Sequence, residues 1–160
     1  MPFLNTPAND PSELLQHLAL ERVSPQWAHF LEGLGEELGG QLSDEELRHL
    51  LFRLGSRFAE KQPLGACTDL AEVESAANRV WRGMRWGYVV LSDLGQCLRV
   101  VHRACPLPAA LQIDTDVAAG YLEGAYGVWL RAAGAPEQLV LRQQASTGVP
   151  MQMVFELMAQ

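Results

Sequence analysis

Cys97, His102 and Cys105 lie close together in the sequence and have side chains of the types that bind zinc. Their spacing does not suit a metal site, because positions 97 and 102 differ in parity and would point to opposite faces of a β-strand. No CxxC pair occurs, and no second pair of ligands is apparent. We therefore expect no metal, and we expect His102, which shares parity with Leu98 and Val100, to be hydrogen-bonded and partly buried rather than a catalytic base.

Three carboxylates form a second group, because Asp114, Asp116 and Glu123 lie within a short stretch and glycosidases use two such groups. Acidic residues at the start of a helix also cap its free N–H groups and complement its dipole, and we favour that role for Asp114 and Asp116. The chain contains no Walker loop and no GxGxxG, HExxH or GxSxG motif. The sequence therefore predicts no catalytic residue and no cofactor.

Five aromatic residues form a third group, because flat apolar rings often hold carbohydrate chains; they are Trp86, Tyr88, Tyr121, Tyr126 and Trp129. At strand and helix spacing, such rings more often belong to the core, since each buries a large apolar area. The pattern alone is weak evidence for a binding platform.

Four helices are predicted in the first half of the chain. The first begins at Ser12, and the second has Ser24 as N-cap, Pro25 in its first turn and the Gly39-Gly40 pair as its expected end. A capping box, S-x-x-E from position 43, begins the third, and the fourth begins at position 68 or 69. The third helix carries an apolar face of Leu47, Leu50, Leu51, Leu54 and Phe58, and the fourth one of Leu70, Val73, Ala77, Val80, Trp81 and Met84.

The second half changes to a period of two. Residues 85–104 predict a β-hairpin, a long helix follows from about residue 114, and residues 138–158 predict a second hairpin in which Met151, Met153, Phe155 and Leu157 share one face. Helices followed by hairpins that flank a long helix indicate an α+β fold, in which that helix covers one face of an antiparallel sheet.

Composition limits the partners and the compartment. At 160 residues and 48% hydrophobic content, the chain is expected to be a single domain, 1–160, with a mobile N-terminal arm at 1–11. A net charge of −7 with a single lysine argues against nucleic acid and against an anionic membrane surface. No secretory signal, membrane-spanning segment or disulfide framework is apparent, so we expect free thiols and a cytoplasmic location without membrane insertion.

Gly120, Gly124 and Gly127 fall on one side of the predicted long helix, although each glycine in a helix costs about 1 kcal/mol relative to alanine. Two interpretations are open: the glycine side receives a helix of the same chain, or it forms a subunit contact at which Glu123 also lies. On the second interpretation, Gly124→Leu would break an oligomer and leave a folded subunit.

Four segments resemble one family in the same order: "RWGYVVLSDL", "LRVVH" followed by "CPLP", "YLEGAYGVWL" and "STGVPMQMVFELM". This combination is similar to protein D of bacterial cellulose synthase operons, which has a WGYV strand, an RxVH strand followed by proline, an LEGxYGxW helix and a closing VPxQ strand. The similarity is strong over residues 85–133, visible at 149–158 and faint at the N-terminus.

The resemblance implies a non-catalytic homo-oligomer: an octameric ring, built as a tetramer of dimers, that helps to order glucan chains into cellulose. Either glucan passes between subunits, or the ring is a cytoplasmic scaffold that binds a proline-rich accessory protein and arrays synthase complexes; the sequence favours the scaffold. Candidates for contact with β-1,4-glucan or a partner are Asn5, Thr6, Asn9, Tyr88 and Tyr121. The alternative is a small-molecule sensor with an apolar pocket near residues 86, 126 and 129, and a glycosidase is third.

Overall fold

Helices form the first half of the computed structural model, which describes residues 11–146 and 148–160. They are α1 (Pro11–Leu20), α2 (Pro25–Gln41), α3 (Asp44–Lys61) and α4 (Leu70–Met84). Ser43 and Glu46 form the predicted capping box, in which the Ser43 N–H donates to the Glu46 carboxylate at 2.9 Å. The predicted arm lies outside the described residues except for Pro11, the first residue of α1.

Two details of these helices differ from the prediction. Helix α2 continues through Gly39 and Gly40 and ends at Gln41. A glycine ends a helix by adopting a left-handed conformation, and neither of these glycines has a positive φ. Leu54 was expected on the buried face of α3 but is 44% exposed, because only part of that face meets the core.

The second half forms the predicted antiparallel sheet. Its strands are β1 (Tyr88–Asp93), β2 (Leu98–Arg103), β3 (Leu139–Gln143) and β4 (Gln152–Ala159), in the spatial order β1-β2-β4-β3. The long helix is α6 (Thr115–Ala132), and a short helix that periodicity did not predict, α5 (Leu107–Leu111), precedes it. The fold is α+β, as expected.

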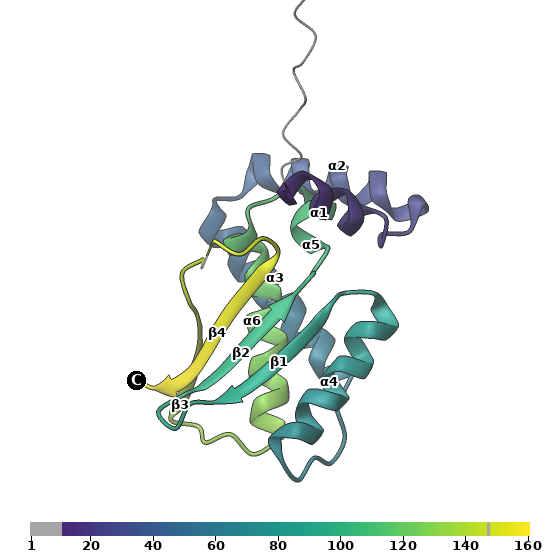
Figure 1. Cartoon of the computed structure of the whole chain (residues 1–160). Helices are drawn as coiled ribbons and strands as arrows, with labels where there is room; N and C mark the ends of the chain where they lie inside the picture. Colours follow the sequence, from purple (N-terminus) through teal and green to yellow (C-terminus); the bar gives the residue numbers. More distant parts are fainter. Residues whose placement is uncertain (1–10, 147) are drawn as a thin grey trace, which may run out of the picture.

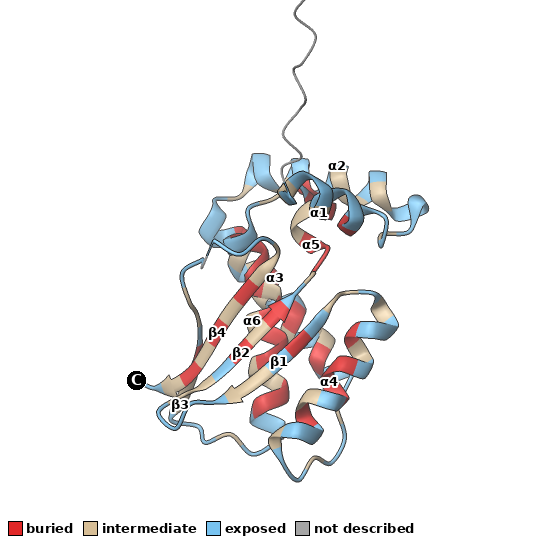
Figure 2. Ribbon diagram, in the orientation of Figure 1, coloured by how far each residue is buried: buried red, intermediate tan, exposed pale blue. Residues whose placement is uncertain are grey.

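Helix α6 lies between the sheet and α3, with α4 beside it (Figure 1). Buried residues gather on α6, on α3 and on the inward-facing positions of the strands, whereas α1 and α2 are largely exposed (Figure 2). Trp81, Leu122, Tyr126 and Phe155 are among the most buried side chains. The core is therefore centred where α6 meets the sheet.

The outer edge of β1 is closed by side chains of α4. Asn78 exchanges two hydrogen bonds of 2.8 Å with the backbone of Val89, and the N–H of Leu91 donates to the Glu74 carboxylate at 2.7 Å. An exposed strand edge invites pairing with another chain. Helix α4 therefore protects this edge while it packs on the core.

Candidate functional site

Helix α6 and helix α3 approach each other through glycine. A methyl group added at Gly120 would lie 2.5 Å from the carbonyl oxygen of Arg48, and one added at Gly124 would overlap the carbonyl oxygen of Phe52. Gly55 of α3 makes the reciprocal approach to the backbone of Tyr121. The structure agrees with the first of the two interpretations of these glycines, in which they receive a helix of the same chain.

The assignment of Gly120 and Gly124 as subunit-interface residues is therefore wrong, because α3 of the same chain already covers both and leaves them buried. Gly127 is different, since no atom lies within 4 Å of an added methyl group there. A role for Gly127 or Glu123 in a subunit contact stays a prediction.

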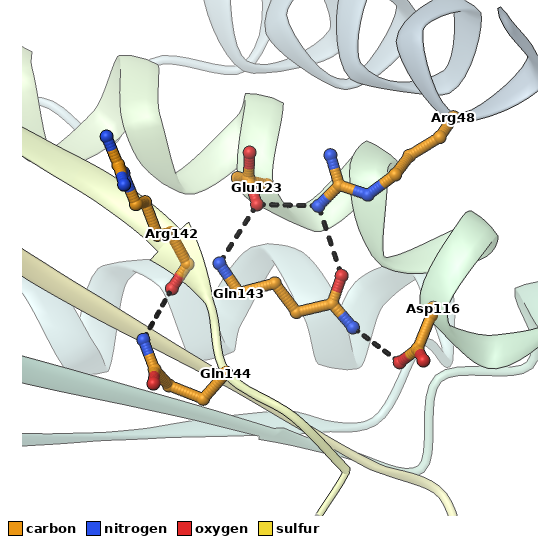
Figure 3. A network of polar contacts seen from close by, with 6 residues as sticks. All are labelled: Arg48, Asp116, Glu123, Arg142, Gln143 and Gln144. Atoms are coloured by element: carbon orange, nitrogen blue, oxygen red, sulfur yellow. Dashed lines mark hydrogen bonds and ion pairs between the residues drawn. The ribbon is translucent and has the colours of Figure 1, made fainter. Parts of the chain in front are cut away.

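The close approach of the two helices brings Arg48 of α3 over a polar network on α6 and β3 (Figure 3). The Arg48 guanidinium donates to the Glu123 carboxylate at 2.7 Å and to the side-chain oxygen of Gln143 at 3.1 Å. The backbone N–H of Gln143 donates to Glu123 at 3.1 Å, and its side-chain amide donates to Asp116 at 2.7 Å. One glutamine thus links two of the three carboxylates that the sequence singled out, Asp116 and Glu123.

An open cavity of about 430 Å³ lies over this network; it is lined by Arg48, Asp116, Glu123, Arg142, Gln143, Gln144 and Ala145. The side chain of Gln143 lies between the two carboxylates (Figure 3), so they do not converge on one bond as a glycosidase pair must. Asp114 is the N-cap of α6 and accepts from the N–H of Asp116 at 2.8 Å, as predicted. The arrangement offers hydrogen bonds to a polar ligand, and its two carboxylates are already engaged by donors of the chain.

His102 is fully buried rather than partly buried as expected. Its Nε2–H donates to the carbonyl oxygen of Trp86 at 2.7 Å, so Nδ1 is the acceptor for the Tyr126 hydroxyl at 2.5 Å. Burial lowers the pKa of His102 to about 4, and burial raises the pKa of Tyr126 well above its ordinary value. The neutral imidazole therefore has two structural hydrogen bonds and is not placed to act as a base.

The cysteines do not combine with this histidine. Cys105 is buried, and burial raises the pKa of its thiol to about 12, while Cys67 and Cys97 are half-buried free thiols. In the part of the chain that the structure describes, no group of three or more His, Cys, Asp or Glu side chains could hold a metal ion.

Trp81 fills the place where the sensor alternative expected a pocket. Its ring centroid lies 6.1 Å from that of Trp86, 5.9 Å from that of Tyr126 and 5.1 Å from that of Trp129. Because these rings pack against one another, they leave no room between them for the pocket that the sensor alternative expected, and that part of the prediction is wrong. Sequence reasoning placed Trp81 on the apolar face of its helix but did not identify it as the centre of the core.

The structure describes two of the five candidate contact residues, Tyr88 and Tyr121. Tyr121 packs its ring against Phe58 and Trp86, with centroids at 5.8 and 5.2 Å, and is half-buried. Tyr88 is 39% exposed on β1. Asn5, Thr6 and Asn9 lie outside the described residues. Contact of any of these with glucan or a partner stays a prediction.

The sequence profile of one family, the cellulose synthase D subunits, matches residues 13–156, which is nearly the whole chain. The chain belongs to this family. The protein therefore has a role in cellulose biosynthesis, and family membership implies association with the cellulose synthase complex. Within the described ranges, it has no helix that is both long and apolar enough to cross a membrane.

One solved structure that resembles the chain is a trafficking protein particle complex subunit 3 from Naegleria fowleri, covalently bound to palmitic acid. Its TM-score is 0.48 at 10% sequence identity, and the match covers 92% of this chain and 96% of that one. Nothing about binding or function follows from a likeness at this level. No curated protein matches the chain.

The segments that carry the family resemblance contain residues of the interior. Trp86 of the WGYV segment and His102 of the RxVH segment are joined by a hydrogen bond, and Gly124 of the LEGxYGxW segment lies against α3. The segments of the family resemblance therefore include residues that hold the sheet, α6 and α3 together.

Sequence reasoning missed a group of exposed apolar side chains on α1 and α2, namely Leu14, Leu18, Leu20, Trp27, Phe30 and Leu34. We call it the α1–α2 surface. On α2, positions 27, 30 and 34 follow helical spacing, so the signal was present, next to the inward-facing Leu31, Gly35 and Leu38. Helix α2 is thus apolar over a wider arc than the core covers.

Proposed function

We propose that the chain is a non-catalytic accessory subunit of bacterial cellulose biosynthesis. It assembles into a ring-shaped homo-oligomer, an octamer built as a tetramer of dimers, on the cytoplasmic side of the inner-membrane cellulose synthase complex. The ring organises synthase complexes and their glucan chains for export and crystallisation. Membership of the family of cellulose synthase D subunits supports a role in the pathway, and the α1–α2 surface supports assembly.

The α1–α2 surface is the observation that carries the proposal. Leu14, Trp27 and Phe30 are 59%, 56% and 57% exposed, and the Trp27 and Phe30 rings meet edge to face with centroids 5.5 Å apart. Single exposed apolar side chains are common, but six on two consecutive helices are typical of a contact surface. These side chains are 37–59% exposed, so burying the remainder of each would contribute roughly half of the 1.5 to 3 kcal/mol expected for a fully exposed side chain, which favours association.

A proline-rich accessory protein is the second proposed partner of this surface. Aromatic side chains that stand together bind polyproline segments well, because such a segment is already extended and loses little entropy on binding. The Trp27–Phe30 pair provides such a site on α2. Contact with β-1,4-glucan is proposed for Tyr88, Tyr121 and the N-terminal residues Asn5, Thr6 and Asn9.

The polar network supports a non-catalytic role. Glu123 is held by Arg48 and by a backbone N–H, and Asp116 is held by Gln143, so each carboxylate has a structural partner. A glycosidase in this position would need both groups free to face one glycosidic bond. Release of reducing sugar from cello-oligosaccharides by the purified protein would contradict the non-catalytic role.

The mass of the protein in solution tests the assembly. Light scattering after size exclusion is expected to give a mass near eight times 17.6 kDa. A monomeric mass at all concentrations would contradict the ring and would favour the sensor alternative, which requires no large assembly. Deletion of residues 2–11 is expected to preserve the oligomer and lower cellulose output in cells, whereas loss of folding on that deletion would contradict the assignment of this segment as an arm.

A further inference from the structure

A second cavity, of about 360 Å³, lies at the C-terminal end of α4, away from the network of Figure 3. It is lined by Arg22, Arg82, Arg85, Gly87, Tyr88 and Ala104. Arg22 comes from the turn between α1 and α2, and the other two arginines come from the last turn of α4 and its C-cap. Three arginines from two separate segments thus line one concave surface, which we call the arginine cavity.

The charge at this cavity is unbalanced. The chain has a net charge of −7 and only 12 basic residues, yet none of these three arginines forms an ion pair with a carboxylate of the described residues. Arg22 donates one hydrogen bond of 3.3 Å to the carbonyl oxygen of Ala104, and the side chains of Arg82 and Arg85 make no hydrogen bond within the described part. An acidic protein therefore places three arginines at one cavity with no ion-pair partner among the described residues.

Helix capping explains only part of this charge. The C-terminus of a helix carries about half a negative charge, and one arginine in the last turn more than balances it. Arg82 fills that role for α4. Arg22 and Arg85 remain as positive charge in excess of what the helix end needs.

The backbone holds the cavity in shape. Arg85 is left-handed with φ 59°, Gly87 has φ 81° and Ala104 has φ 62°. A side chain at Gly87 would overlap the carbonyl oxygen of Arg103, so the turn into β1 lies directly against the end of β2. The turn that carries Arg85 and Tyr88 is therefore fixed by the fold and formed before any ligand arrives.

We propose that the arginine cavity binds a phosphorylated small molecule. Arginine forms paired, charge-assisted hydrogen bonds to phosphoryl oxygens, and Arg22, Arg82 and Arg85 can hold one or two phosphoryl groups. The half-exposed ring of Tyr88 contacts the organic part of the ligand. A cavity of about 360 Å³ has the size of a small-molecule site, which favours such a ligand over a protein surface or a membrane. This binding does not depend on the ring assembly.

Isothermal titration calorimetry at low ionic strength tests the proposal, with pyrophosphate as the first probe. The full-length protein is expected to bind it, and Arg82→Gln combined with Arg85→Gln is expected to weaken binding about tenfold or more. The matched control is Arg79→Gln, an exposed arginine of α4 that does not line the cavity. No binding of pyrophosphate, or an equal loss in the control, would overturn the proposal, and a thermal melt shows that each variant is folded.

Further probes identify the source of the phosphoryl group. Adenosine diphosphate presents a planar base, ribose 5-phosphate presents only a sugar, and a short-chain phosphatidic acid presents a lipid headgroup. With Tyr88 as the contact for the organic part, adenosine diphosphate is expected to bind more tightly than pyrophosphate, and Tyr88→Ala is expected to remove that difference. Equal affinity for all probes would contradict the role of Tyr88, and a preference for the lipid would overturn the assignment to a soluble metabolite.

Discussion

The contact between α3 and α6 is the opposite of the α1–α2 surface. In the first, one side of a helix is buried within the chain; in the second, apolar side chains of two helices stay exposed. On α6, Gly120 and Gly124 let the backbone of α3 come into direct contact, and the interface is complete within one chain. On α2, Trp27 and Phe30 project from the molecule and stay exposed. The glycines mark a contact already made within the chain. The large exposed side chains mark a surface that the chain leaves open, and the proposed assembly would bury it.

The physical reason for this difference is the apolar area of each side chain. Glycine contributes almost no apolar area, so its place in a helix is favourable only if a neighbouring backbone fills the space directly above it. Trp27 and Phe30 each offer a large apolar area that is favourable only when buried. Helix α2 packs on α5 and α3, and the side chains of Trp27 and Phe30 stay more than half exposed.

Gly124→Leu gives the largest expected effect on the closed contact. The first atom of the new side chain already overlaps the carbonyl oxygen of Phe52, so we expect loss of the folded state or a fall of more than about 3 kcal/mol in the free energy of unfolding. This replaces the sequence-based expectation that the variant would stay folded and only lose its oligomer. Urea unfolding followed by circular dichroism measures it.

Gly127→Ala is the matched control for that substitution, on the same helix. With no atom within 4 Å of the added methyl group, it is expected to raise stability by about 0.5 to 1 kcal/mol through helix propensity alone. If Gly124→Leu were as stable as the native protein and only smaller in solution, the glycines would be a subunit contact after all.

Trp27→Ser combined with Phe30→Ser tests the open surface. We expect the mass in solution to fall to that of a smaller species, while the free energy of unfolding of the subunit changes little, because both side chains are exposed. Light scattering after size exclusion measures the mass. Leu94→Ser, which removes a 47% exposed side chain from the turn between β1 and β2, should leave the mass unchanged. An intact assembly in the double variant would show that the subunits meet elsewhere.

The titration of His102, which is buried in the interior, is expected to give a smaller, pH-dependent effect on the free energy of unfolding. Its pKa is lowered from 6.5 to about 4 by burial, so between these values the unfolded chain binds a proton that the folded chain does not. Stability therefore falls as the pH falls through this range, by about 2 kcal/mol between pH 7 and pH 5. Urea unfolding at both pH values measures it.

His102→Gln is the control, because glutamine can hydrogen-bond but does not titrate. The variant is expected to be less stable at pH 7 and to lose about 2 kcal/mol less than the native protein between pH 7 and pH 5. Equal pH dependence in the two proteins would show that the histidine is protonated inside the fold, and that the buried cluster is more open than the structure has it.

Local patterns were enough to predict most elements. The Ser43–Glu46 capping box lies where α3 begins, and the alternation of Met153, Phe155 and Leu157 predicts the buried face of β4. These signals are read correctly because capping and alternation depend on residues a few positions apart. Helix α5 was missed because it has only 5 residues, too few to show a period.

The candidate site could be predicted only in part. The types of Asp116 and Glu123 marked them as noteworthy, but Gln143 and Arg48, which hold them, are distant in the sequence and carry no motif. The arginine cavity gave no signal either, since Arg22 lies far along the chain from Arg82 and Arg85. Such sites depend on which elements become neighbours.

The sequence by itself determined the α+β class, the starts of most helices, the family and the presence of glycine on one side of α6. Each of these follows from residue type and short-range spacing. Only the tertiary structure decided which surface those glycines meet, that Trp81 fills the centre of the core, and which apolar side chains remain exposed. These outcomes depend on packing between elements that are far apart in the chain, and the same helical period fits a partner in the same molecule or in another. In this fold, α3 packs against Gly120 and Gly124, so the glycine side of α6 is satisfied within the chain, whereas Trp27 and Phe30 remain exposed.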